Sequence, residues 1–194
     1  MRVPTLPHLI LLFFLGGTFV HFFIAGSRTF YYRAGDAGPA AVASQGAFLF
    51  GGVIPIWYLG LNHPIHLPNG ILAACVLVAC IGLYEWARAT IWGRRFGLGW
   101  GDHVPEELCE RGPYRYVRHP LYLSYVLAPV ACLVALPHWI TALMVSANIV
   151  MWTLAAKSDE RRIAQSPLAG PYEEYRQRVG MLLPRLRWRY STSA

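Results

Sequence analysis

The chain has 194 residues, of which 55% are hydrophobic and only 14% are charged, whereas a typical soluble domain has about 25% charged residues. This composition excludes an ordinary soluble domain and indicates a membrane protein. The net charge of +7 fits either nucleic acid or an anionic membrane surface, and the positions of the charges decide between them. The four cysteines form no CxxC pair and the histidines share no metal-ligand spacing, so we predict neither a disulfide framework nor a metal site.

Five apolar segments approach the length of about 20 residues that a transmembrane helix needs. The first resembles a signal peptide but lacks a convincing cleavage site, so we expect an uncleaved span. Gly51, Gly52 and Pro55 interrupt the second, which predicts a kink or a close helix contact. The uncharged run 121–156 is too long for one span, and Pro137 divides it into an antiparallel hairpin. The expected spans are 6–25, 40–61, 69–89, 121–136 and 139–156.

The lysines and arginines fall almost entirely on one side of these spans. Fifteen lie in the segments that face one side, Arg2 lies on the other, and Arg88 ends the third span. The positive-inside rule places the rich side in the cytoplasm, so we expect the N-terminus outside and the C-terminus inside. In a bacterium the membrane would be the plasma (inner) membrane. This asymmetry also explains the basic composition without nucleic acid as a partner.

The polar chemistry is concentrated in two cytoplasmic segments, 93–120 and 157–190. In the first, a Gly112-Pro113 turn is followed by Arg118 and His119 at a bend, because Pro120 suits the first position of a helix. Free N–H groups at such a helix start can hold an anion. In the second, residues 168–171 break the chain between two short helices. The latter of these, 172–179, places its apolar side chains on one face, which could cover the first segment.

Two separated motifs carry a family resemblance. Gly-Pro-Tyr-x-x-x-Arg-His-Pro-x-Tyr occupies 112–122, and after the hairpin come Glu160, a Tyr-x-x-Tyr stretch at 172–175 and Pro184. This pattern resembles the isoprenylcysteine carboxyl methyltransferase family and its bacterial phospholipid-methyltransferase-like relatives, over about residues 93–187. The resemblance implies an all-α polytopic protein of about five spans. Its regions would be N-terminal helices at 1–92 and a catalytic region at 93–194, which contains a C-terminal helical hairpin and a cytoplasmic cofactor pocket.

The resemblance also implies S-adenosylmethionine as the cofactor. The helix start would suit the carboxylate of the cofactor, and Glu160 its ammonium or ribose hydroxyls. The family arginine that contacts the substrate carboxylate is replaced here by Ala156, so we expect an acceptor other than a prenylcysteine. The implied cofactor-binding residues are Glu106, Glu107, Leu108, Cys109, Tyr114, His119, Pro120, Leu121, Tyr122 and Glu160. The candidate catalytic residues, expected to contact the substrate, are Lys157, Arg178 and Arg118.

We therefore predict a membrane methyltransferase that acts on a lipophilic or small carboxylate, thiol or amine, with membrane lipids as partners. Two alternatives stay open. A small transporter or assembly partner would carry functional polar residues inside the spans. A membrane reductase on a related scaffold would need a larger cytoplasmic pocket than this sequence can build.

Overall fold

The computed structural model describes residues 5–26, 39–92 and 107–185. Within these residues the secondary structure is helical, apart from one isolated bridge between Val117 and Gly180. The helices are α1 (Leu6–Gly26), α3 (Pro39–Asn62), α4 (Leu67–Thr90), the 3-10 turn η2 (Gly112–Arg115), α5 (Pro120–Ala135), α6 (Trp139–Ile163) and α7 (Ala169–Arg178). The all-α prediction is confirmed for this part of the chain.

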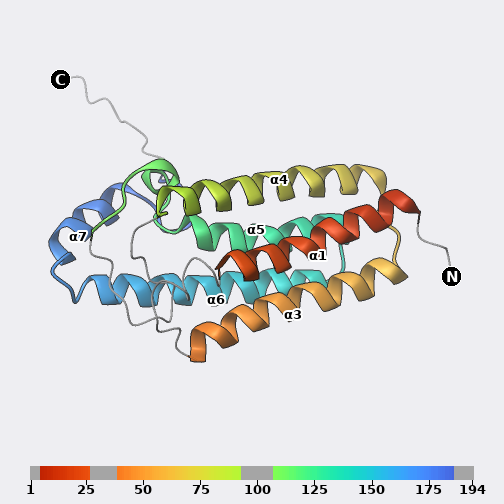
Figure 1. Ribbon diagram of the computed structural model, residues 1–194, viewed down its shortest axis with the longest axis horizontal. Helices are drawn as coiled ribbons and strands as arrows, with labels where there is room; N and C mark the ends of the chain where they lie inside the picture. Colours follow the sequence, from red (N-terminus) through yellow and green to blue (C-terminus); the bar gives the residue numbers. More distant parts are fainter. Residues whose placement is uncertain (1–4, 27–38, 93–106, 186–194) are drawn as a thin grey trace, which may run out of the picture.

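The five long helices lie side by side in one elongated bundle, with α7 and η2 at one end (Figure 1). In this bundle α4 packs on α5, α5 on α6, and α1 on α3. Each expected segment is a helix, and most boundaries agree within about two residues. Three helices are long and apolar enough to cross a membrane, namely α1, α4 and α6, while α5 and the 46–62 part of α3 are shorter apolar helices.

Two boundaries differ from the sequence prediction. Helix α6 does not end near 156 but continues to Ile163, because side chains of its charged last turns pair along the helix, as Arg162 does with Asp159. Helix α7 already begins at Ala169, so the break lies at 164–168. Pro171 then falls in the first turn of α7, where a missing N–H costs no hydrogen bond.

The core of the bundle is a cluster of interlocking aromatic rings. Phe22 contacts Tyr84 at 4.4 Å between ring centroids, and Tyr125 stacks on Trp152 at 4.5 Å. The expected close contact in α3 is present: a Cβ on Gly52 would lie 2.2 Å from the ring of Phe19. The absence of a side chain at this position therefore lets α3 approach α1.

The hairpin of α5 and α6 brings residues near 119 and 160 to the same end of the bundle. Pro120 occupies the start of α5, and the His138 side chain caps α6 by accepting from the Ile140 N–H at 3.2 Å. The hairpin thus carries the two sequence motifs to the end where α7 lies (Figure 1).

Candidate active site

The segment that leads into the site begins with a tight bend at Gly112. Gly112 has φ of +55°, and a Cβ there would lie 2.5 Å from Thr90 Oγ1, so glycine is needed for both the backbone conformation and the space. The chain then turns through η2 and runs beside the segment that follows α7. The Arg118 N–H donates to Gly180 O at 2.8 Å, and the His119 N–H donates to Met181 O at 3.1 Å. The segment 180–181 therefore covers the start of α5.

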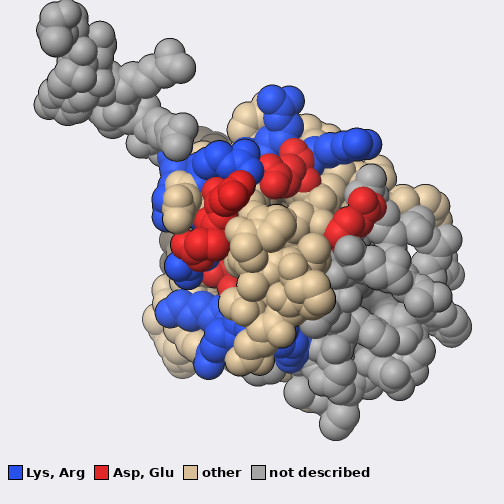
Figure 2. Space-filling model, turned by 90° about the vertical axis from the view of Figure 1, so that its left-hand side faces the viewer, with Lys and Arg blue, Asp and Glu red and all other residues tan. Residues whose placement is uncertain are grey.

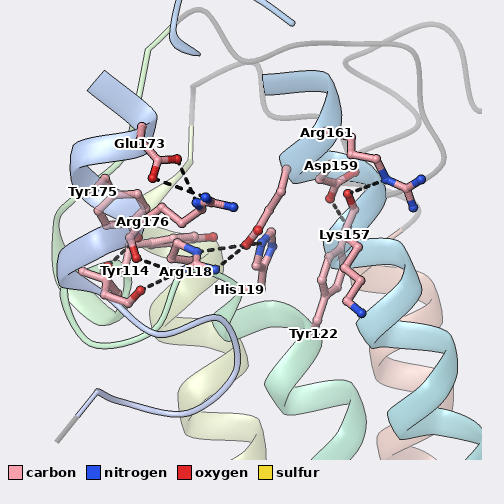
Figure 3. Close-up of polar contacts among 12 residues, drawn as sticks. Tyr114, Arg118, His119, Tyr122, Lys157, Asp159, Arg161, Glu173, Tyr175 and Arg176 are labelled. Atoms are coloured by element: carbon pink, nitrogen blue, oxygen red, sulfur yellow. Dashed lines mark hydrogen bonds and ion pairs between the residues drawn. The ribbon is translucent and has the colours of Figure 1, made fainter. Parts of the chain in front are cut away.

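Arg118 and His119 lie beside α7 (Figure 3), and both contact Glu160 to form a polar cluster. Arg118 contacts Glu160 Oε1 through Nη2 at 2.7 Å and Nε at 2.9 Å, and His119 Nε2 lies 3.3 Å from the same oxygen. Arg118 also donates to the carbonyl oxygens of Arg176 and Val179 at the end of α7. The arginine side chain is only 7% exposed, so the cluster ties α5, α6 and α7 together.

Two adjacent carboxylates at the end of α6 differ in their electrostatics. Both lie past Ala156, where the uncharged run of the helix ends. Burial opposes ionisation of Glu160, but His119 and Arg118 outweigh it and lower its pKa to about 2. Burial raises the pKa of Asp159 to about 6, against a 2.6 Å hydrogen bond from the Tyr122 hydroxyl. Neighbouring carboxylates with separated pKa values are suited to different roles.

Helix α7 is fixed over the bend by its tyrosines. Tyr172, Tyr175 and Val179 form the predicted common face, with Leu108 and Ile163 packed against it. The Tyr175 hydroxyl donates to Tyr114 O at 2.6 Å. Burial raises the pKa of Tyr175 above its ordinary value, so this hydroxyl remains a donor at neutral pH.

A pocket of about 460 Å³ opens between α6 and α7. Its volume lies in the range of small-molecule sites. Lys157 and Arg161 rise from the α6 side of this region and Arg176 from the α7 side (Figure 3). The lining residues are Lys157, Glu160, Arg161, Ala164, Ala169, Tyr172, Glu173, Arg176 and Met181.

The comparisons with known proteins match the hairpin and the helix before it. The model of the isoprenylcysteine carboxyl methyltransferase (ICMT) family matches residues 71–165. Over this stretch, which is just under half of its length, the chain is similar to the ICMT-like membrane methyltransferases. A protein from a Pseudomonas species named methanethiol S-methyltransferase is 32% identical over 95 residues, which cover 44% of this chain and 33% of that protein. The match thus spans about a third of that relative's length. No solved structure matches the chain.

The family resemblance inferred from the motifs is therefore confirmed, and the ICMT-like cofactor can be tested against the pocket. The Tyr172 hydroxyl is buried close to Glu160 and Arg118 but makes no hydrogen bond of normal geometry with them, and its residue lines the pocket. The Arg118 and His119 contacts of Glu160 all go to Oε1, which leaves Oε2 able to accept a hydrogen bond. These groups fit a ligand that carries hydroxyls and an ammonium.

The other predicted residues of the ICMT-like site are spread around the bend. Tyr114, Pro120, Leu121 and Tyr122 are buried in the core next to the cluster, and Cys109 is buried there too. Tyr122 stacks on His119 with 5.4 Å between ring centroids. Leu108 packs under α7, Glu107 is exposed, and Glu106 lies outside the described residues.

The three candidate catalytic residues separate in space. Lys157 lines the pocket, whereas Arg118 lies in the buried cluster. Arg178 is exposed and pairs with Glu110 at 3.0 Å. Asp159, Arg161 and Arg176 were not predicted as site residues from the sequence. The i, i+4 spacing of Lys157 and Arg161 indicates that both lie on one helix face.

Proposed function

We propose that the chain is an S-adenosylmethionine-dependent membrane methyltransferase with five spans and a cofactor pocket on the cytoplasmic side. The family match over 71–165 carries this proposal. It is supported by the pocket beside Glu160, at the end of the bundle where charged side chains of both signs surround an uncharged centre (Figure 2). Membrane lipids would surround the bundle, and the acceptor would enter at the membrane face.

The cofactor would supply a methyl group on a positively charged sulfur: as the nucleophile forms its bond to the methyl carbon, the carbon–sulfur bond would break and S-adenosylhomocysteine would leave as a neutral thioether. The task of the protein is then to align the reactants and exclude water, and such positioning can supply about 7–11 kcal/mol of the barrier. Glu160 and the Tyr172 hydroxyl would hold polar groups of the cofactor. Arg118 would act by fixing Glu160 and α7 in place, since its guanidinium is buried in the cluster.

For the acceptor we propose a small thiol, because the matched relative is named a methanethiol S-methyltransferase. A thiol must lose its proton before or during attack. Glu160, with a pKa of about 2, is a poor base at neutral pH, whereas the pKa of Asp159, about 6, is better matched to that task. The Tyr122 hydroxyl donates a hydrogen bond to Asp159, and the Tyr122 ring stacks on His119. Tyr122 thus links Asp159 to the cluster.

The test is calorimetric titration of the purified protein in detergent with S-adenosylhomocysteine, followed by methyl transfer from labelled S-adenosylmethionine. We expect saturable binding and transfer to a small alkyl thiol. A farnesylcysteine analogue should be a poor acceptor, because Ala156 stands where the family carries its carboxylate-binding arginine. Absence of binding would refute the cofactor assignment, and efficient methylation of the farnesyl compound would refute the choice of acceptor.

A further inference from the structure

The charges around the pocket are unequally compensated. Both carboxylates in its wall are occupied: Glu160 by Arg118 and His119, and Glu173 by Arg176 at 2.8 Å. Within the described residues, no carboxylate lies within ion-pair distance of Lys157 or Arg161. Among the described residues, Arg161 donates to the Lys157 carbonyl, at 3.2 Å. Within the part of the chain that the structure describes, the α6 wall of the pocket therefore presents two cations that no carboxylate neutralises.

These two cations are placed where a ligand in the pocket can reach them. They lie one turn apart on α6, and both line the pocket, so an oxyanion beside this wall can contact both. Their side chains are exposed at the rim, which leaves long, flexible stems free to turn toward a bound group. Tyr172 and Met181 complete the wall with less polar surface.

The start of α5, the other candidate anion site, is covered by the segment that follows α7. The N–H groups of Arg118 and His119 donate to Gly180 O and Met181 O, and Pro120 has no N–H to offer. The next residues, Leu121 and Tyr122, are buried. A carboxylate in the pocket therefore finds its available positive charge on α6 and not at the start of α5.

We propose that Lys157 and Arg161 form an anion subsite that takes the carboxylate of the amino-acid part of S-adenosylmethionine. This assignment rests on the proposed function and adds the orientation of the cofactor. The amino-acid end points to the α6 rim, and the Glu160 Oε2 and Tyr172 hydroxyl face the parts of the cofactor further inside. The same oxyanion chemistry is present in the phosphate of an anionic lipid headgroup, which the experiment has to distinguish.

The experiment compares two ligands on the full-length protein in neutral phosphatidylcholine nanodiscs. S-adenosylhomocysteine carries the amino-acid carboxylate, whereas 5'-methylthioadenosine keeps the adenine, ribose and thioether but lacks the amino-acid part. We expect the Lys157→Gln, Arg161→Gln double variant to bind S-adenosylhomocysteine at least tenfold more weakly and methylthioadenosine within twofold of wild type. The matched control is Arg162→Gln, which removes one charge from the same helix turn outside the pocket wall and should leave both affinities unchanged.

Three outcomes would overturn the subsite. Unchanged S-adenosylhomocysteine binding in the double variant would show that the pair does not touch the carboxylate. Equal weakening of both ligands would show a structural role. The pair would be assigned to lipid headgroups if the double variant still bound S-adenosylhomocysteine but lost a preference for phosphatidylglycerol nanodiscs that the wild-type protein shows. If the wild-type protein binds neither ligand, both the proposed function and the subsite are refuted. Each of the three outcomes above refutes the subsite alone.

Discussion

At the scale of single residues, the cluster around Glu160 decides how the three C-terminal elements are held together. The family resemblance predicts that His119 and Glu160 share one cofactor site although they are 41 positions apart, and their side chains lie 3.3 Å apart. The contacts of Arg118 to carbonyl oxygens at the end of α7 could not be inferred, because backbone acceptors leave no mark on side-chain patterns.

Glu160→Gln should lower stability in a pH-dependent way. The variant leaves the buried Arg118 without its ion pair, and the expected cost at pH 7 is about 2 kcal/mol. Because folding lowers the pKa of Glu160 to about 2 from an ordinary 4.5, its contribution is fully present above about pH 5 and is lost as the pH falls toward 2. Thermal unfolding in detergent from pH 7 to pH 3 should show the gap between wild type and variant closing. The exposed Glu173→Gln is the control, and a gap that stays constant with pH would contradict the assignment.

Tyr175→Phe should loosen α7, whereas Tyr172→Phe should not. The Tyr175 hydroxyl donates to Tyr114 O at 2.6 Å in a buried position, and leaving that acceptor unpaired costs about 1–3 kcal/mol. The Tyr172 hydroxyl makes no hydrogen bond at normal geometry, so its removal should leave stability near the wild-type value. Proteolysis at the α7 end and thermal unfolding measure the difference. Equal effects of the two substitutions would show that the hydrogen bond does not hold α7.

At the scale of helices, apolar length and prolines predicted α1, α3, α4 and α5 well. The end of the apolar run did not predict the end of α6. A helix can continue beyond its apolar part where ion pairs along it, such as Asp159 with Arg162, stabilise the charged turns. The prediction also failed at the start of α7, where a Gly-Pro pair was interpreted as a break although proline is tolerated in a first helical turn. Hydrophobicity therefore predicts where helices cross an apolar layer better than where they end in water.

The close contact between α1 and α3 can be tested with a second pair of matched substitutions. A Cβ on Gly52 would overlap the buried Phe19 ring at 2.2 Å, whereas a Cβ on Gly51 meets nothing within 4 Å. We expect Gly52→Ala to cost about 1–3 kcal/mol through overpacking. Gly51→Ala should be neutral or slightly stabilising, since alanine favours a helix by about 1 kcal/mol over glycine. Thermal unfolding of both variants in the same detergent tests this, and similar values for the two would show that α1 and α3 are not in tight contact.

At the scale of the whole molecule, the charged side chains and the pocket lie at the same end of the bundle. Charged side chains crowd the end that carries α7 (Figure 2), while the connections at the opposite end, 63–66 and 136–138, contain no lysine, arginine, aspartate or glutamate. The two arms of the hairpin, 121–136 and 139–156, rise about 24 and 27 Å in helical form, close to the roughly 30 Å of a hydrocarbon layer. If these arms cross the hydrocarbon layer, we expect the charged residues from Lys157 onward to lie at its surface, next to the pocket.

This charge distribution makes the orientation of the molecule testable. The sequence predicts fifteen basic residues on one side of the membrane and one on the other, so we expect α7 and the C-terminus in the cytoplasm. Single cysteines at Asn62, the last residue of α3, and at Gln165, after α6, would lie at opposite ends of the bundle (Figure 1). In a background with the exposed Cys75 replaced by serine, an impermeant maleimide added to intact cells should label the Asn62→Cys protein and not the Gln165→Cys protein. The buried Cys80, Cys109 and Cys132 serve as the unlabelled background.

Labelling at 165 from outside would show the opposite orientation of the chain. The pocket would then lie outside the cytoplasm, away from the cellular supply of S-adenosylmethionine. The same measurement therefore tests both the orientation and the proposed cofactor.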